Sequence, residues 1–141
     1  MTIADPGDPL NQLLEALKRL RAGWPQRGWS WDSRLSCVSS SFNTDIEPQA
    51  KQAATIALSG EWTMNNIGQA PPALQTIAQR TGGLRQGQRV LCSAAFGRVF
   101  AYGLWWPWGD GQTTSMRIGL GGADSVRDAS ARLCEAFGVE P

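Results

Sequence analysis

The sequence predicts an α+β fold, an antiparallel sheet of about four strands with helices packed mainly on one face. Apolar segments joined by glycine-containing turns, at 88–95 and within 96–120, form a three-stranded meander, and successive short hairpins are typical of antiparallel sheets. Segments with apolar residues at helical spacing stand near both ends of the chain. A length of 141 residues without an internal repeat or linker predicts one globular domain spanning 1–141.

The first helix is predicted over residues 9–22. Asp8 is a suitable N-cap because its carboxylate accepts hydrogen bonds from free backbone N–H groups, and Pro9 is a suitable first helical residue. Gly23 ends the helix. Its apolar stripe consists of leucines at helical spacing, which are Leu10, Leu13, Leu14, Leu17 and Leu20.

The middle of the chain is predicted to alternate between strands and helices. An aromatic-rich connection leads to a strand at 33–42. The T-x-x-E pattern at 44–47 is that of a capping box, which indicates a second helix directly after it. EWTM at 61–64 is a candidate short strand, and the proline pair at 71–72 opens a third helix that stops at the glycine turn 81–83.

The strand before the hairpin joins it by a turn around 96–97. A three-residue turn aligns Val90 and Cys92 with Tyr102 and Leu104, whereas a two-residue turn puts the polar neighbours of Val90 and Cys92 on that face. The three-residue turn is preferred because it keeps the face apolar.

The register of the hairpin itself depends on the loop at its tip. A three-residue loop at 109–111, with Gly111 in the left-handed conformation, makes one face almost wholly apolar. A two-residue turn at 110–111 shifts the register by one residue and places Trp105 opposite Met116. Because register is strongly specified where one face is buried, the three-residue loop is preferred. The predicted pairs are then Trp108–Gln112, Trp106–Thr114, Leu104–Met116, Tyr102–Ile118 and Phe100–Leu120.

This register gives the three tryptophans of the hairpin different roles. Trp106 joins the core, and Trp108 closes the tip and is half exposed. Trp105 lies on the outer face, diagonal to Arg117, where an exposed tryptophan beside an arginine is a candidate cation–π pair or contact site. Large aromatic residues more often pack than recognise a partner, so a Trp105 covered by a helix or by the N-terminal aromatic residues is the commoner alternative.

The segment IGLGGADS at 118–125 joins the hairpin to a last helix at about 124–137. Glycines between a strand and a helix can bind phosphate through their backbone N–H groups. However, Asp124 stands where a dinucleotide-binding motif has its third glycine, and its charge repels phosphate. The segment therefore predicts a tight turn in which the helix is capped by Asp124, or by Ser125 together with Asp128.

The chain has no histidine, which excludes the Ser-His-Asp and Cys-His nucleophile systems and the usual zinc sites. The cysteines lie in apolar surroundings without metal-ligand spacing and are predicted to be reduced and buried. They are Cys37, Cys92 and Cys134. Asp32, Glu61 and Asp110 stand beside tryptophan or glycine and are weak candidates for carboxylate catalysis. We expect no catalytic residue, no metal and no cofactor.

The charge distribution offers a binding hypothesis. A net charge of +1 is far from that of a strongly basic domain, so we expect no nucleic-acid partner. No acidic residue lies between Glu61 and Asp110, and with the nearby aromatic residues this stretch is a candidate basic face for a small anionic ligand. Scattered arginines are more often merely solvated. Those in this stretch are Arg80, Arg85, Arg89 and Arg98.

The expected location is the bacterial cytoplasm. No apolar run approaches the length of a membrane span, and the start MTIADPGDPL has neither the basic nor the apolar part of a signal peptide, so we expect a soluble protein with no membrane contact. Lys18 and Lys51 are the only lysines among many arginines, which suggests a GC-rich bacterial genome.

We therefore expect a non-catalytic binding or adaptor protein that contacts a protein partner through the hairpin tip and the adjacent strand face. A sensor domain for a small anionic or aromatic ligand is the alternative, and an enzyme that uses carboxylates is the third. An unpaired edge strand beside Pro107 leaves a homodimer open. The predicted contact residues are Trp105, Trp108, Asp110, Arg117, Arg98 and Arg89.

Overall fold

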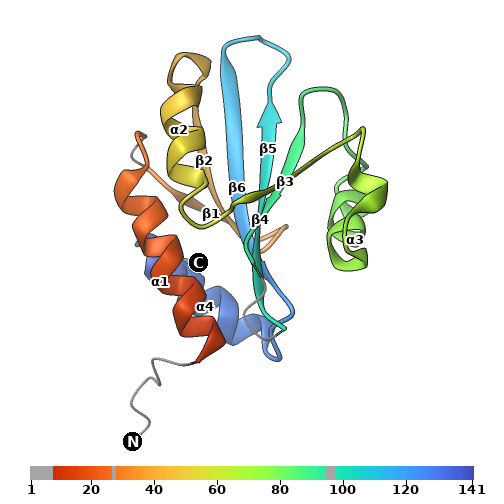
Figure 1. Cartoon of the computed structure of the whole chain (residues 1–141). Helices are drawn as coiled ribbons and strands as arrows, with labels where there is room; N and C mark the ends of the chain where they lie inside the picture. Colours follow the sequence, from red (N-terminus) through yellow and green to blue (C-terminus); the bar gives the residue numbers. More distant parts are fainter. Residues whose placement is uncertain (1–7, 27, 95–97) are drawn as a thin grey trace, which may run out of the picture.

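The computed structural model describes residues 8–26, 28–94 and 98–141. They form a six-stranded antiparallel sheet in the order β1-β2-β6-β5-β4-β3 (Figure 1). The strands are β1 (Ser30–Asp32), β2 (Cys37–Asn43), β3 (Gly60–Thr63), β4 (Arg89–Cys92), β5 (Phe100–Pro107) and β6 (Thr113–Gly121). The α-helices are α1 (Pro9–Gly23), α2 (Glu47–Ala54), α3 (Pro72–Arg80) and α4 (Val126–Phe137), with 3₁₀ turns η1 (Thr44–Ile46) and η2 (Ile67–Gln69).

The α+β class with an antiparallel sheet is confirmed, but the sheet has six strands instead of about four. The strand predicted at 33–42 is shorter, because residues 33–36 form a turn and only β2 follows, and this turn joins β2 to the additional strand β1 in an antiparallel hairpin. Asp32 builds this turn, because its Oδ1 accepts hydrogen bonds from the backbone N–H groups of Arg34 (3.0 Å) and Leu35 (3.2 Å). Ser36 completes it in the left-handed conformation, with φ of 54°.

Helix ends follow local capping chemistry. The Asp8 carboxylate accepts from the Leu10 N–H at 3.1 Å, as predicted for the start of α1. The Ser125 hydroxyl accepts from the Asp128 N–H at 3.1 Å, so Ser125 caps α4 and the alternative with Asp124 as N-cap is wrong.

The capping box predicted at 44–47 does not form. The Asn43 side chain accepts from the Asp45 N–H at 2.8 Å and opens η1 instead, and α2 begins only at Glu47. The side chain one residue upstream thus replaces the predicted cap.

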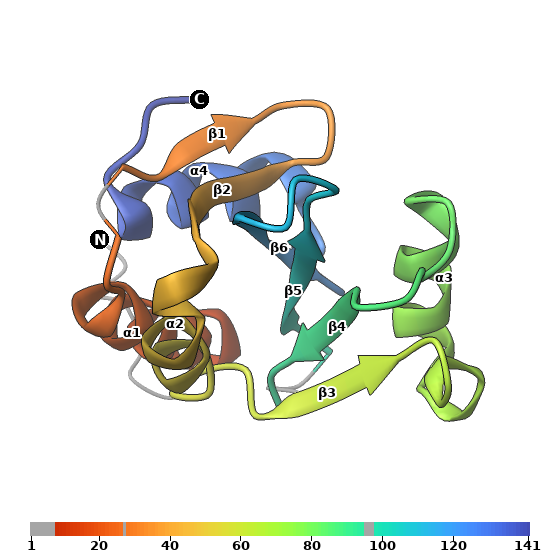
Figure 2. The ribbon, with the colours of Figure 1, turned by 90° about the horizontal axis from the view of Figure 1, so that it is seen from above.

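Helices cover both faces of the sheet. Figure 2 shows α1, α2 and α4 on one side and α3 alone on the other. The predicted arrangement with helices mainly on one face therefore did not include the helix that covers the second face. The larger core lies on the side of α1, α2 and α4, and Leu74 and Ile77 of α3 pack against the opposite face. Strand residues in the larger core include Val38, Phe42, Leu91, Trp105 and Ile118.

The predicted register of the β5–β6 hairpin is wrong by one residue. Trp105 lies opposite Met116, as in the alternative that was not preferred, and Trp106 lies opposite Ser115. The loop at 109–112 has four residues and is closed by a hydrogen bond from the Trp108 N–H to the Thr113 carbonyl (2.7 Å). Gly111 is left-handed, as predicted.

Packing of large residues over glycines explains this register. The Tyr102 ring lies over Gly119, where an added Cβ would stand 2.5 Å from the ring, and the Phe100 ring covers Gly121 in the same way at 2.3 Å. Aromatic residues across from glycines are a known device for fixing register. Because helices cover both faces, neither face of the hairpin has to be wholly apolar.

The strand β4 joins this arrangement in the predicted register, with Val90 opposite Leu104 and Cys92 opposite Tyr102. The predicted turn around Phe96-Gly97 lies outside the described residues. The strand β5 stands inside the sheet between β6 and β4, so the expected edge strand beside Pro107 is wrong. The edges are β1 and β3.

Candidate functional site

The one-residue shift buries Trp105 in the larger core, while Trp106 packs half-buried against the smaller core on the side of α3. Trp105 is only 4% exposed, and its ring packs edge-on against Phe42 with centroids 5.4 Å apart. The Lys51 ammonium lies 5.8 Å above the Trp105 ring centroid. The predicted exposure of Trp105 on the outer face is therefore wrong, because that side of the sheet carries α1, α2 and α4.

Trp106 occupies the environment that had been expected for Trp105. It lies opposite Ser115, it is half-buried, and the Arg117 guanidinium carbon stands 5.0 Å from its ring centroid. Its indole Nε1 is buried and has no hydrogen-bond partner within the part of the chain that the structure describes. The expected tryptophan–arginine pair thus exists, but with the neighbouring tryptophan.

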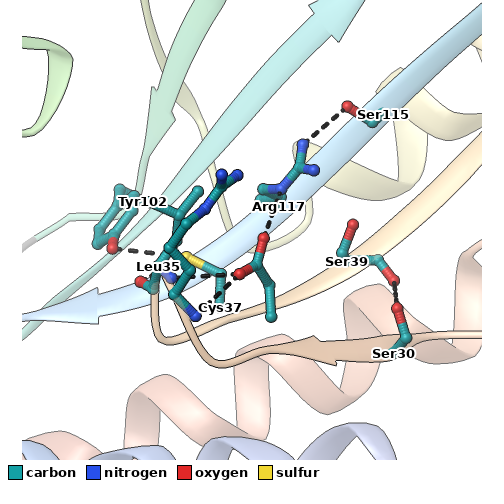
Figure 3. Close-up of polar contacts among 9 residues, drawn as sticks. Ser30, Leu35, Cys37, Ser39, Tyr102, Ser115 and Arg117 are labelled. Atoms are coloured by element: carbon teal, nitrogen blue, oxygen red, sulfur yellow. Dashed lines mark hydrogen bonds and ion pairs between the residues drawn. The ribbon is translucent and has the colours of Figure 1, made fainter. Parts of the chain in front are cut away.

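A partly buried ion pair orients Arg117. Its Nε donates to Asp32 Oδ2 at 3.2 Å, and its Nη1 donates to the Ser115 hydroxyl at 3.1 Å. The side chains of Arg117 and Asp32 are only 21% and 19% exposed. Figure 3 shows the Arg117 guanidinium beside Ser115, so a residue of β6 and, through Asp32, a residue of β1 fix the cation beside Trp106.

The pKa of Asp32 is lowered by its partners. Partial burial raises it, but the hydrogen bonds from Arg117 and from the backbone of Leu35 and Arg34, with the charge of Arg117, together outweigh burial. A carboxyl whose pKa is lower in the folded than in the unfolded protein stabilises the fold above the unfolded pKa of about 3.9. That stabilisation is lost as the pH falls through the lower folded value.

The variant Asp32→Asn tests this linkage. We expect its free energy of unfolding to fall less steeply than that of the wild type as the pH decreases from neutral through 4, measured by urea denaturation at several pH values. Part of the dependence remains, because Lys51 and Arg89 also lower the pKa of Glu61 against its desolvation. Asp45→Asn, at an exposed position, is the control that keeps the wild-type slope. Equal slopes for Asp32→Asn and wild type contradict the linkage.

The hairpin tip presents Trp108, which is 51% exposed. Asp110 organises the loop beneath it: its Oδ1 accepts from the backbone N–H groups of Gln112 (2.8 Å) and Thr113 (2.9 Å), and its Oδ2 accepts from the Thr113 hydroxyl (2.8 Å). These hydrogen bonds lower the pKa of Asp110. Asp110 therefore positions Trp108 through the shape of the loop.

Arg89 and Arg98 lie apart from the tip. Arg89 pairs with Glu61 at 2.9 Å on the side of α2, where Glu61 also contacts Lys51. Arg98 pairs with Asp124 at 2.9 Å, near the opposite end of β5 from the tip. The six predicted contact residues thus do not form one surface.

The hypothesis of one basic face over Arg80, Arg85, Arg89 and Arg98 is wrong for the same reason. Arg89 faces α2, whereas Arg80 lines a cavity on the side of α3. The stretch between Glu61 and Asp110 lacks acidic residues, but this does not make its arginines neighbours in space. The sheet separates those on the side of α2 from those on the side of α3.

The carboxylates proposed for catalysis do not converge. Asp32 is in β1 and Glu61 is in β3, which are the two opposite edges of the sheet, and Asp110 is in the tip loop. Within residues 8–26, 28–94 and 98–141, no group of His, Cys, Asp and Glu side chains has the arrangement of a metal site. Asp32, Glu61 and Asp110 therefore do not form a catalytic pair with one another.

The Cys37 thiol lies in the core on the side of α3, 3.6 Å from the Tyr102 hydroxyl (Figure 3). Burial raises the pKa of Cys37 to about 11, so the thiol stays protonated and unreactive at neutral pH. Cys37 and Cys134 are buried, as predicted, whereas Cys92 is partly exposed, and none of the three forms a disulfide within the described part of the chain.

The chain matches no protein-family model, curated protein or solved structure with which it was compared. Its function must therefore be argued from the surface itself. Among the described residues, no helix combines the length and the apolar character that crossing a bilayer requires.

The surface that the structure brings together consists of Trp106, Trp108, Arg117 and Asp32, which we call the hairpin surface, and the buried Ser115 hydroxyl supports Arg117 within it. Sequence reasoning identified Trp108 and Arg117 as contact residues, but it assigned Trp106 to the core and considered Asp32 only as a catalytic carboxylate. The signal for Trp106 was the alternation of Phe100 and Tyr102 across from two glycines, which specifies the register. The signal for Asp32 was its residue type, because an aspartate often starts an Asx turn by accepting a hydrogen bond from the backbone N–H two residues later, here that of Arg34.

Proposed function

We propose that this protein is a non-catalytic binding protein that contacts a protein partner through the hairpin surface. The observation that carries the proposal is that β5 and the tip loop present an exposed Trp108 and a half-buried Trp106, and that Arg117 forms a cation–π contact with the Trp106 ring. Tryptophan and arginine are the residue types most enriched among the energetically dominant residues of protein interfaces.

Pre-organisation supports the same proposal. The ion pair and hydrogen bond of Arg117 fix its guanidinium before any partner arrives, and Asp110 fixes the loop that carries Trp108. Side chains that are already ordered lose less conformational entropy on binding. On the same face as Arg117, the neighbouring strands β1 and β2 carry the hydroxyls of Ser30, Ser39 and Ser41, which suit the polar rim of an interface.

The proposal includes a bacterial cytoplasmic location, in keeping with three thiols that are far apart in sequence and unpaired in the described part of the chain. It does not include an edge-to-edge homodimer through β5, because β5 has neighbours on both sides. The edge strands of the sheet, where a second copy could pair, are β1 and β3.

The decisive experiment captures partners from a native lysate with wild-type protein, with Trp108→Ala and with Val126→Ala. Val126 is exposed and apolar but lies at the start of α4, away from the tip, and is the matched control (Figure 1). We expect a protein that wild type and Val126→Ala retain equally and whose recovery falls at least tenfold with Trp108→Ala, because an interface tryptophan contributes about 2 kcal/mol or more.

Direct contact is tested by placing a photo-crosslinking amino acid at position 108 and, as a control, at position 126. The proposal expects the same protein to be crosslinked from position 108 only. Retention that is insensitive to Trp108→Ala, or no protein enriched over the empty resin, contradicts a partner-binding role for the hairpin surface.

A further inference from the structure

A cavity lies on the side of α3, separate from the hairpin tip. The last turn of α3 and the turn between β1 and β2 both stand on this side of the sheet (Figure 2). Between them, over β5, is a cavity of about 230 Å³. Six of its lining residues carry the argument, and they are Arg34, Leu35, Ile77, Arg80, Tyr102 and Leu104.

The cavity is positively charged. Arg34 and Arg80 are both exposed, and neither forms an ion pair within the described residues. None of the lining residues is acidic. The nearby carboxylate of Asp32 is already engaged by Arg117 and by two backbone N–H groups, so it does not neutralise the two arginines. Two cations beside a concave surface attract an anion.

The floor of the cavity combines one polar group with an apolar surface. Tyr102 is 7% exposed, and among the described residues its hydroxyl has only the weakly bonding Cys37 sulfur as a partner, at 3.6 Å. Leu104 and Ile77 supply apolar contacts beside it. Arg80 also acts on this floor electrostatically, because its charge lowers the pKa of Cys37 and of Tyr102 against the larger effect of burial.

The position of Tyr102 is fixed by packing. Its ring lies over Gly119, where no side chain competes for the space, and a second cavity of about 160 Å³ meets the first at Leu35, Arg80 and Tyr102. Tyr102 and Arg80 therefore both line the place where the two cavities meet. A site with a few polar groups on an otherwise apolar lining is typical of small-molecule binding.

We propose that this cavity binds a small organic oxyanion, with Arg80 and Arg34 holding a carboxylate or phosphate group and Leu104 and Ile77 contacting its apolar or aromatic body. A volume of about 230 Å³ equals that of roughly eight liquid-phase water molecules at about 30 Å³ each, which fits a single ring with one acidic group. The inference does not depend on the proposed partner surface, since its residues are different.

The test is an NMR titration of the ¹⁵N-labelled full chain with benzoate, phenyl phosphate, inorganic phosphate and neutral benzamide at millimolar concentrations. We expect saturable shifts of the Arg34, Leu35, Arg80 and Thr81 amides with benzoate, phenyl phosphate or both. Whichever of the two binds more tightly distinguishes a carboxylate from a phosphate ligand. Benzamide, which lacks the charge, and inorganic phosphate, which lacks the apolar body, are expected to bind at least tenfold more weakly.

Variants locate the site. Arg80→Gln removes one cation and is expected to raise the Kd at least tenfold, because the oxyanion loses a charged hydrogen-bond donor. Arg85→Gln, which removes an equally exposed arginine outside the cavity, leaves the Kd unchanged. The proposal is overturned by the absence of saturable shifts at these amides, by equal affinity for benzamide or inorganic phosphate, or by an equal loss of affinity in Arg85→Gln.

Discussion

Replacing Trp105 by alanine is expected to lower the free energy of unfolding by about 3–5 kcal/mol, the range for large aromatic residues in protein cores. Trp105 is almost fully buried, packs edge-on against Phe42, and lies opposite Met116 in the centre of the sheet. Its removal leaves a cavity between the sheet and α2, which the surrounding strands cannot close without losing their register. Urea denaturation at neutral pH measures the change.

Trp108→Ala is the matched control, because Trp108 is a tryptophan of the same hairpin but half exposed at its tip. Surface substitutions of this kind usually change stability by about 0.5 kcal/mol or less. If Trp105→Ala leaves the stability near that of the wild type, or if Trp108→Ala is the more destabilising of the two, the observed register of β5 and β6 is contradicted.

The parts of the fold that were predicted correctly depend on local chemistry. The limits of α1 follow from Asp8, Pro9 and a leucine stripe, all within one helix. The Ser125–Asp128 cap of α4 is equally local. Such features can be recognised in a sequence because the interacting groups are at most a few residues apart.

The hairpin register was missed because it depends on an element that is remote in the sequence. An all-apolar face is the right criterion for a sheet covered on one side. Here α3 covers the second side, so Leu104 and Tyr102 are buried there while Trp105 is buried on the other. The aromatic–glycine pairs across β5 and β6 indicate the observed register. They could be preferred over an all-apolar face only once both faces of the sheet were known to be covered.

The candidate site was predicted in part for the same reason. The tip with Trp108 follows from the turn residues alone, whereas the exchange of Trp105 for Trp106 follows from the register. The partners of Arg89 and Arg98 are 28 and 26 residues away in sequence, and no local pattern indicates such pairings. The cavity between Arg34 and Arg80 could not be predicted either, because it forms only where α3 lies beside the β1–β2 turn, and these two elements are remote in the sequence.

The glycine facing Tyr102 provides a second test of the register. Gly119→Ala places a methyl group 2.5 Å from the Tyr102 ring and 3.0 Å from the Cys37 sulfur, both in the buried interior. The Tyr102 ring has to move to admit this methyl group, and the Cys37 sulfur, which lies 3.6 Å from the Tyr102 hydroxyl, limits that movement. We expect a loss of about 1–3 kcal/mol in the free energy of unfolding, as for other insertions into a packed core.

Gly109→Ala is the control for this substitution, because Gly109 lies in the loop of the same hairpin and an added Cβ there meets no atom within 4 Å. Alanine also reduces the conformational freedom of the unfolded chain, so Gly109→Ala is expected to be neutral or slightly stabilising. Combining Gly119→Ala with Tyr102→Leu removes the ring that causes the clash, and the double variant should lose less than the sum of the two single changes. Strict additivity means that Tyr102 does not lie over Gly119, and both the register and the floor of the oxyanion cavity would then have to be revised.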